Sequence, residues 1–200
     1  FRRGVAFAKK EIHGKNADKF AQDDDIFPED FEDIVKAESF KLVGDISKDV
    51  LKKTQDIILN GMKSGASEAE IRKAIMDTVP DVKERHINTI VRTRTNEIFN
   101  HARKSFFDTD ETAKDIIVGY QYSAILDDRT TEICQRLDEM TFSVDDSGFI
   151  DKIVPPTHWG CRSMLVPVTR FEEPSFSEPM DINELKDLGG NLIFAMGTHE

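Results

Sequence analysis

The sequence predicts an α+β protein, in which an N-terminal helical segment of three helices precedes a small α+β domain with few strands and an irregular C-terminal tail. Up to about residue 107, apolar residues recur at steps of three and four, the period of an amphipathic helix. From residue 117 the chain is rich in β-branched and aromatic residues, which favour strands. We therefore expect an N-terminal arm, a helical region, an α+β domain and a tail, over residues 1–28, 29–112, 113–172 and 173–200.

Three helices are expected within the helical region. The first covers residues 31–62 and carries one apolar stripe. Ser67 and Glu70 have the spacing of a capping box, in which each side chain accepts a hydrogen bond from the other residue's backbone. A short helix to Thr78 follows from this signal, and a third helix is expected over residues 82–107. The preceding residues 1–28 show no sustained period, so we expect this arm to depend on a partner for its order.

The α+β domain is expected to hold two main strands joined by short elements. The apolar run at 117–126 predicts a strand, and the polar turn after it predicts a short helix over 131–137. A small extended piece at 141–142, a turn at 145–148 and a second main strand at 163–169 follow. Proline and glycine residues make the tail irregular, and its apolar patch at 192–196 is a candidate partner-binding segment.

The charge balance excludes one class of protein. The formal net charge is −11, which argues against a dedicated DNA-wrapping protein, since such a protein shows a basic face. The third helix is locally basic, however. Either it is an ordinary solvated helix face, or some of its bases contact double-stranded DNA at one place. The candidate DNA contacts are Arg92, Arg94, Arg103 and Lys104.

No stretch of the sequence is typical of a membrane protein or of a disulfide-rich one. No apolar run approaches the roughly 20 residues that span a bilayer, so we expect no membrane partner. There are only 2 cysteines. This number is too small for a disulfide scaffold and indicates assembly in a reducing cytoplasm.

Thiol and imidazole groups suggest a metal site. Cys134 lies on or beside the short helix, and His158 and Cys161 form a His-x-x-Cys pair just before the second main strand. Thiolate and imidazole are preferred zinc ligands, and Gly160 gives the backbone freedom that a tight turn needs. A tetrahedral structural site takes a fourth ligand. Asp128 is preferred for its position at the strand end, while Asp127, His86 and His101 are alternatives.

Two interpretations without a metal compete with this one. The cysteines could form a disulfide once the protein leaves the reducing interior of the cell. Alternatively, they are buried thiols that act as small hydrophobic side chains, with His158 hydrogen-bonded to Asp127 or Asp128.

The charged turn between strand and short helix is expected to have a structural role. Arg129 can form paired hydrogen bonds with Asp127 or Asp138, and Thr130 can cap the short helix. Arg162, directly after Cys161, can bind Asp128 in the same way.

Known catalytic motifs are missing from the sequence. The zinc deaminase pattern needs a His-x-Glu, which the chain does not contain, and no HExxH, Gly-x-Ser-x-Gly, Walker or GxGxxG motif is present. We therefore expect no enzyme. The alternative is a metal- or cysteine-dependent hydrolase or nuclease, with Cys134 and His158 as a nucleophilic pair or Asp127 or Asp128 as a base near an open metal position. A third possibility, a small zinc-dependent nucleic-acid-binding module, is disfavoured by the acidity of the chain.

Several motifs in a fixed order resemble the phage Mu F-like minor head proteins. The first is Tyr-Ser-Ala-Ile-Leu-Asp-Asp-Arg-Thr at 122–130, followed by Cys-Gln-Arg-Leu at 134–137 and Pro-Pro-Thr-His-Trp-Gly-Cys-Arg-Ser at 155–163. The resemblance covers about residues 53–168. It departs from the family pattern at Arg94, where the family often has an acid, and at Glu139, where it usually has glycine.

The resemblance implies a virion protein of a tailed bacteriophage. Such a minor capsid protein would sit in the head interior or at the portal vertex, contact the portal protein and the major capsid or other head proteins, and act in head morphogenesis and in DNA packaging or ejection. It would be assembled in the host cytoplasm.

Overall fold

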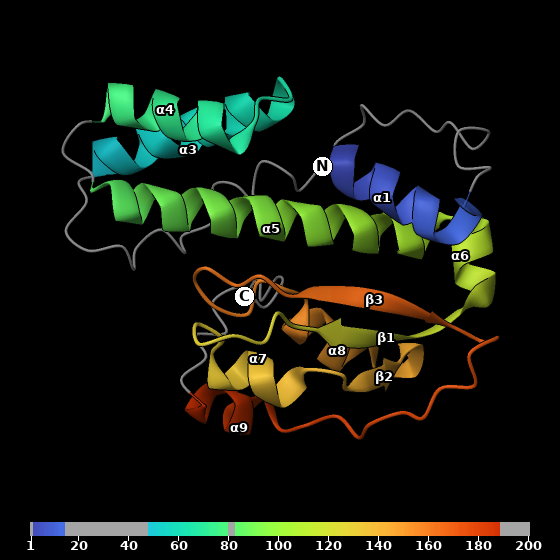
Figure 1. The fold of residues 1–200 in the computed structure, drawn as a ribbon. Coiled ribbons are helices and arrows are strands. Elements are labelled where there is room, and N and C mark those ends of the chain that lie inside the picture. Colours follow the sequence, from blue (N-terminus) through green and yellow to red (C-terminus); the bar gives the residue numbers. More distant parts are fainter. Residues whose placement is uncertain (1, 15–47, 80–82, 189–200) are drawn as a thin grey trace.

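The computed structural model describes residues 2–14, 48–79 and 83–188 and shows an α+β protein with a three-stranded antiparallel sheet. The predicted fold class is therefore confirmed. In Figure 1 the long helix α5 (Glu84–Thr109) runs across the middle of the molecule, between a layer of helices and the sheet. The helices of that layer are α1 (Arg2–His13), α3 (Lys48–Lys63) and α4 (Glu68–Thr78).

The capping box begins α4 as the sequence predicts. The Ser67 hydroxyl accepts a hydrogen bond from the backbone N–H of Glu70, and the Glu70 carboxylate accepts one from the backbone N–H of Ser67 at 2.7 Å. α3 supplies the end of the predicted first helix, whose residues 31–47 lie outside the described residues. Within the described ranges, none of the helices has both the length and the apolar character needed to cross a membrane.

The start of the expected N-terminal arm is a helix, α1, packed along α5. Gly4 allows a close approach, because a Cβ atom there would lie 2.6 Å from the Phe99 carbonyl oxygen. Val5 and Ala8 are buried in the same contact. Such small residues give a weak apolar period, which explains why the sequence did not indicate this helix. Residues 15–28 of the expected arm lie outside the described residues.

The sheet has the order β2-β1-β3, with β1 (Ile117–Ser123) in the centre. A short helix, α6 (Glu111–Ile116), leads into β1, and Tyr122 pairs with Leu165 across the ladder. β3 (Met164–Thr169) is the second predicted strand, and β2 (Thr141–Ser143) is the small extended piece expected near residue 141.

Two short helices replace structure that was expected to be a turn or irregular. The turn at 145–148 is a 3₁₀ helix, η3 (Val144–Asp146), that continues into α8 (Ser147–Ile153) because Phe149, Ile150 and Ile153 together bury an apolar face. In the expected tail, α9 (Ile182–Asp187) inserts the fully buried Leu185 into the core. The apolar patch at 192–196 lies outside the described residues.

The two hydrophobic cores of the protein meet within α5. Its first half, with Ile87 to Ile98, packs against α3 and α4. Its second half, with Ala102 to Phe107, joins the core of the sheet, α1, α8, α9 and α7 (Glu132–Leu137). The expected boundary near residue 112 therefore does not separate the cores, because the C-terminal half of α5 belongs to the core of the sheet.

A polar stripe on α5, formed by Asn96, Asn100 and Arg103, covers the segment of Cys161 to Leu165 at the start of β3. Asn96 donates to the carbonyl oxygens of Cys161 and Ser163, each at 3.2 Å. Asn100 donates to the Ser163 carbonyl at 3.4 Å, and Arg103 donates to the Leu165 carbonyl at 2.6 Å. The helical spacing of the donors matches the alternate carbonyls of an extended chain, so groups that would otherwise be buried without a partner are satisfied.

Two of the four candidate DNA contacts are buried and engaged inside the protein. Arg103 is 1% exposed and makes paired hydrogen bonds to Glu11 of α1, while Arg94 is 0% exposed and pairs with Glu97. Neither side chain can reach DNA, so their assignment as DNA contacts is corrected. Lys104 is half-buried and pairs with Asp108 at 2.7 Å. Of the four candidates, Arg92 is the one whose side chain is exposed.

We expect Asn96→Ala to lower the free energy of unfolding by about 1–3 kcal/mol, because the buried carbonyl of Cys161 loses its donor. Urea unfolding followed by circular dichroism measures this change. Arg92→Ala, an exposed substitution on the same helix, is the control and should change the stability by less than about 0.5 kcal/mol. Equal effects of the two substitutions would contradict the structural role of the stripe.

Candidate metal centre

Cys134 is held in place by the short helix α7. Its neighbour Ile133 and the following Leu137 are fully buried, so the helix turns Cys134, 2% exposed, toward the core. After the helix, Glu139 has a left-handed backbone with φ +63° and donates its N–H to the Tyr122 carbonyl at 2.9 Å. This is the position at which the chain lacks the glycine that the resemblance leads us to expect. The turn keeps the conformation that favours glycine, with a glutamate in it.

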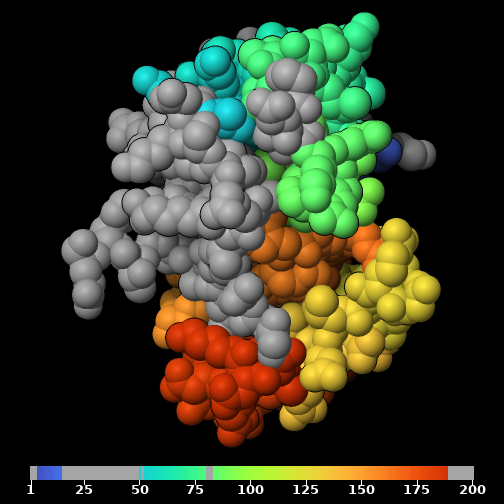
Figure 2. Space-filling model, turned by 90° about the vertical axis from the view of Figure 1, so that its left-hand side faces the viewer, coloured from blue at the N-terminus to red at the C-terminus, as the bar shows by residue number. Residues whose placement is uncertain are grey.

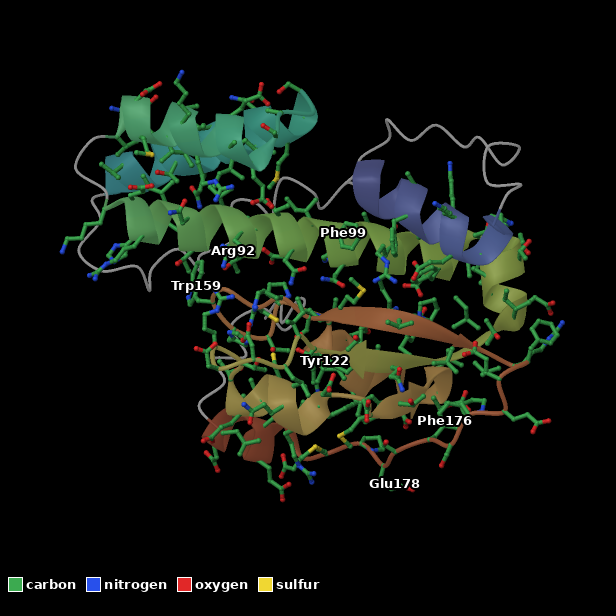
Figure 3. All side chains as sticks on the ribbon, in the orientation of Figure 1. Arg92, Phe99, Tyr122, Trp159, Phe176 and Glu178 are labelled. Carbon is green, nitrogen blue, oxygen red and sulfur yellow. The ribbon has the colours of Figure 1, made fainter. Side chains whose placement is uncertain are left out.

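The tight turn from His158 to Cys161 presents the other two candidate ligands. The backbone N–H of Cys161 donates to the His158 carbonyl at 3.2 Å, and Gly160 has φ +75°, as expected for a permissive position. The turn is tied to α5, since the N–H of Gly160 donates to the Thr93 hydroxyl at 2.8 Å. Trp159 lies between α5 and the α+β domain, where it packs against the helical core (Figure 3).

The structure brings Cys134, His158 and Cys161 together. The Cys134 sulfur lies 3.1 Å from His158 Nε2 and 3.9 Å from the Cys161 sulfur, and the three ligand atoms all lie within 4.8 Å of one another. Figure 2 shows the α7 segment beside the segment that carries the turn. Both cysteines are free thiols, so the disulfide interpretation does not describe this structure, in which the sulfurs are well beyond the roughly 2 Å of an S–S bond.

The arrangement favours ionisation of one thiol. Cys161, His158, Ser163 and Tyr122 all hydrogen-bond to the Cys134 sulfur, and they lower the pKa of Cys134 although burial opposes this. Burial works against the charged form of His158, yet the bond to Cys134 raises the pKa of His158 above its usual value. Deprotonated sulfur is the form that binds a metal, so these contacts favour Cys134 as a ligand, while the hydrogen bond with Cys134, together with burial, raises the pKa of Cys161.

The donor set fits a tetrahedral metal ion. Two thiolates on one zinc at Zn–S distances of about 2.3 Å lie roughly 3.8 Å apart, close to the distance between the two sulfurs here. His158 Nδ1 hydrogen-bonds to the Trp159 carbonyl at 2.9 Å. When Nδ1 carries the proton, Nε2 keeps its lone pair on the side of Cys134, as metal-binding histidines require.

Asp128 does not join these ligands. It is exposed on the turn after β1, and the group that lies within metal-binding reach of one another, among the residues that the structure describes, consists of the two cysteines and His158. His86 and His101, on α5, are not part of that group either. Asp127 is engaged by arginine instead.

Asp127 holds the turn against the segment after Cys161. Arg162 donates to both carboxylate oxygens of Asp127, at 2.7 and 2.5 Å. Asp128 was expected from the sequence as the partner of Arg162, and this expectation was wrong. Arg129 contributes its backbone N–H at 3.0 Å and its guanidinium at 3.4 Å. Thr130 does not cap α7, which begins after Thr131, because its hydroxyl closes the turn on the Ile125 carbonyl.

A small surface pocket borders the cluster. Its lining includes Cys134 and His158 from the cluster and Thr130, Arg129 and Arg162 from the neighbouring turn. Sequence reasoning missed the buried hydroxyls of Tyr122, Thr157 and Ser163 beside the sulfurs. All three stand inside the quoted motifs, so their place in the motifs was the signal that could have identified them.

A comparison with known protein families matches the part of the chain that carries the Cys/His cluster. The phage Mu protein F-like family matches residues 52–166, which include α4, α5, β1, β2, the start of β3 and all three candidate ligands. The chain belongs to this family. The match therefore joins α3 from residue 52, α4 and α5 to the Cys/His cluster in one family unit.

The chain is also similar to an uncharacterized protein of Methanocaldococcus jannaschii. The two are 26% identical over 113 residues, which make up 56% of this chain and 17% of that protein. The chain thus spans a small part of that relative's length. No solved structure matches the chain.

We expect Asp127→Asn to destabilise the protein in a pH-dependent way. Hydrogen bonds from the Arg162 side chain and the Arg129 backbone hold the pKa of the Asp127 carboxyl well below its usual value. The stability that Asp127 provides is therefore complete above its unfolded pKa of about 3.9 and is lost as the pH falls toward the folded value. The stability difference between wild type and variant should be largest near neutral pH and should narrow below about pH 4.

Urea unfolding at a series of pH values measures this difference. Asp128→Asn, at the exposed neighbouring residue, is the matched control and should show little difference from wild type throughout the series. A difference for Asp127→Asn that stays constant down to pH 3 would show that the carboxylate charge is not its source.

Proposed function

We propose that this protein is a structural component of a tailed-bacteriophage head that acts in head morphogenesis. The observation that carries the proposal is the family match, because it covers most of α3, α4, α5 and the Cys/His cluster together. We further propose that the chain sits in the head interior or at the portal vertex of the virion as a minor capsid protein. Its partners there would be the portal protein and the major capsid or other head proteins, and it would serve DNA packaging or ejection after assembly in the host cytoplasm.

The proposal assigns the Cys/His cluster a structural role and no catalytic one. Cys134 and Cys161 are 2% and 1% exposed, so a substrate has little access to either sulfur. Arg162 and Arg129 engage Asp127, the carboxylate that was considered as a base. The buried donor set, fastened to α5 and to the charged turn, suits an ion that holds segments together.

We propose Zn²⁺ as the ion, held by Cys134, His158 and Cys161. The ligands come from α7 and from the turn after α8, two segments that the ion would fasten to each other. A water molecule would take the fourth position. Since the unfolded chain has no preformed site, binding free energy adds to the stability of the fold. Exposed Arg92 remains a proposed contact with packaged DNA.

Removal of the metal should lower the stability of the wild-type chain. With free zinc about 1,000-fold above the dissociation constant, linkage adds roughly 4 kcal/mol to the free energy of unfolding, so a chelator should lower the melting temperature measurably. Thermal unfolding with zinc and with EDTA measures the shift. A Cys134→Ser, Cys161→Ser double variant is the control and should show no zinc-dependent shift. Identical melting curves for the wild type in zinc and EDTA would overturn the metal assignment.

The head role is tested by assembly. Co-expression of the chain with the portal and major capsid proteins of the same virus should yield particles or portal complexes that contain it after gradient purification. Quantitative mass spectrometry of the purified particles gives its copy number. Absence of the chain from particles, with soluble folded protein left at the top of the gradient, would contradict the structural proposal whatever the metal result.

A further inference from the structure

We propose that Tyr122, Thr157 and Ser163 form a hydroxyl cage that positions the two sulfurs for the metal. These three residues are not themselves ligands in this proposal. They are positioning residues that act through Cys134 and Cys161. The inference rests on the proposed zinc centre and extends it to three residues that sequence reasoning did not assign to it.

Tyr122 reaches the cluster from the central strand β1. Its side chain is 0% exposed, and its hydroxyl lies 3.3 Å from the Cys134 sulfur and 4.0 Å from the Cys161 sulfur. The tyrosine therefore contacts sulfurs from both segments that the metal would join. Figure 3 shows Tyr122 on β1 within the α+β domain, below α5.

Thr157 and Ser163 complete the cage from either side of the turn. The Thr157 hydroxyl lies 3.6 Å from the Cys134 sulfur, 3.9 Å from the Cys161 sulfur and 3.1 Å from the Tyr122 hydroxyl. The Ser163 hydroxyl donates to the Cys134 sulfur at 3.3 Å. Thr157 and Ser163 are 1% and 2% exposed.

The hydroxyls can supply the hydrogen-bond donors that two metal-bound thiolates need. A metal-bound thiolate carries no proton and can only accept hydrogen bonds, so the neighbouring hydroxyls must donate. Each of the three hydroxyls brings one proton to a site with two buried thiolates. An apolar surrounding of the same shape would leave those charges without donors, at a large desolvation cost. The cage therefore orients the sulfurs and stabilises their negative charge at the same time, as groups around metal ligands commonly do.

β1 also supplies a matched control. Tyr120 is 4% exposed and lies two residues before Tyr122, so it points to the same face of the strand, but it packs beside Lys104 and Phe107. Tyr120→Phe and Tyr122→Phe remove the same atom from equally buried tyrosines. At Thr157, valine removes the hydroxyl at nearly constant volume, whereas serine retains it.

The full chain and these variants are loaded with Zn²⁺, and the affinity is measured by competition with a chromophoric chelator. We expect Tyr122→Phe and Thr157→Val to bind zinc about 10-fold or more weakly than wild type, the usual effect of removing a group that supports a ligand. Tyr120→Phe and Thr157→Ser should stay close to wild type. In the Co²⁺-loaded proteins, the thiolate-to-cobalt charge-transfer band should shift in the first two variants and not in the controls.

The outcomes separate this inference from the zinc proposal. Wild-type protein that binds no zinc overturns the centre and the cage together. Wild-type protein that binds zinc, with Tyr122→Phe and Thr157→Val that bind as tightly and give the same cobalt spectrum, overturns the cage alone. Should Tyr122→Phe fail to fold, the comparison of Thr157→Val with Thr157→Ser decides the question by itself.

Discussion

The hydrogen bonds between α5 and the start of β3 are the interaction on which the rest of the structure depends. Asn96, Asn100 and Arg103 supply donors where a further strand would otherwise be needed to cover the extended segment. The helix thus takes the place of a strand along that edge. Because each donor meets a defined carbonyl, the position of α5 along β3 is fixed. Arg103 also binds Glu11, so the same stripe fastens α1.

This fastening explains how three distant side chains form one centre. Asn96 donates to the carbonyl of Cys161, and the Thr93 hydroxyl accepts from the backbone N–H of Gly160 in the turn before it. Asn96 and Thr93 both lie on α5. On the other side, the pairing of Arg162 with Asp127 connects the segment after Cys161 to the turn that precedes α7. The sulfurs therefore lie close to each other because α5 and the pairing of Arg162 with Asp127 hold the backbone on both sides of them.

Much of the fold and part of the site could be predicted from the sequence. The capping box at Ser67 and the strand at 117 were readable because each depends on local chemistry. α1 was missed because Gly4 and Ala8 pack closely against α5 without adding large apolar side chains to the pattern. α8 was missed because the acidic residues before it are typical of a turn. Cys134, His158 and Cys161 were found by residue type. The partners of Arg103 and Arg162 were not, because a charged residue reads as exposed until long-range packing, invisible in one sequence, supplies Glu11 and Asp127.

The position of Trp159 has a practical consequence for solution work. It is the sole tryptophan of the chain, it follows directly after one candidate ligand, and its indole packs on the helical core rather than on the sheet. Its emission spectrum is thus an intrinsic, label-free gauge of how firmly the helical layer is seated on the α+β domain. Unfolding of the contact between Trp159 and the helical core can therefore be followed in the unmodified protein with an ordinary fluorimeter.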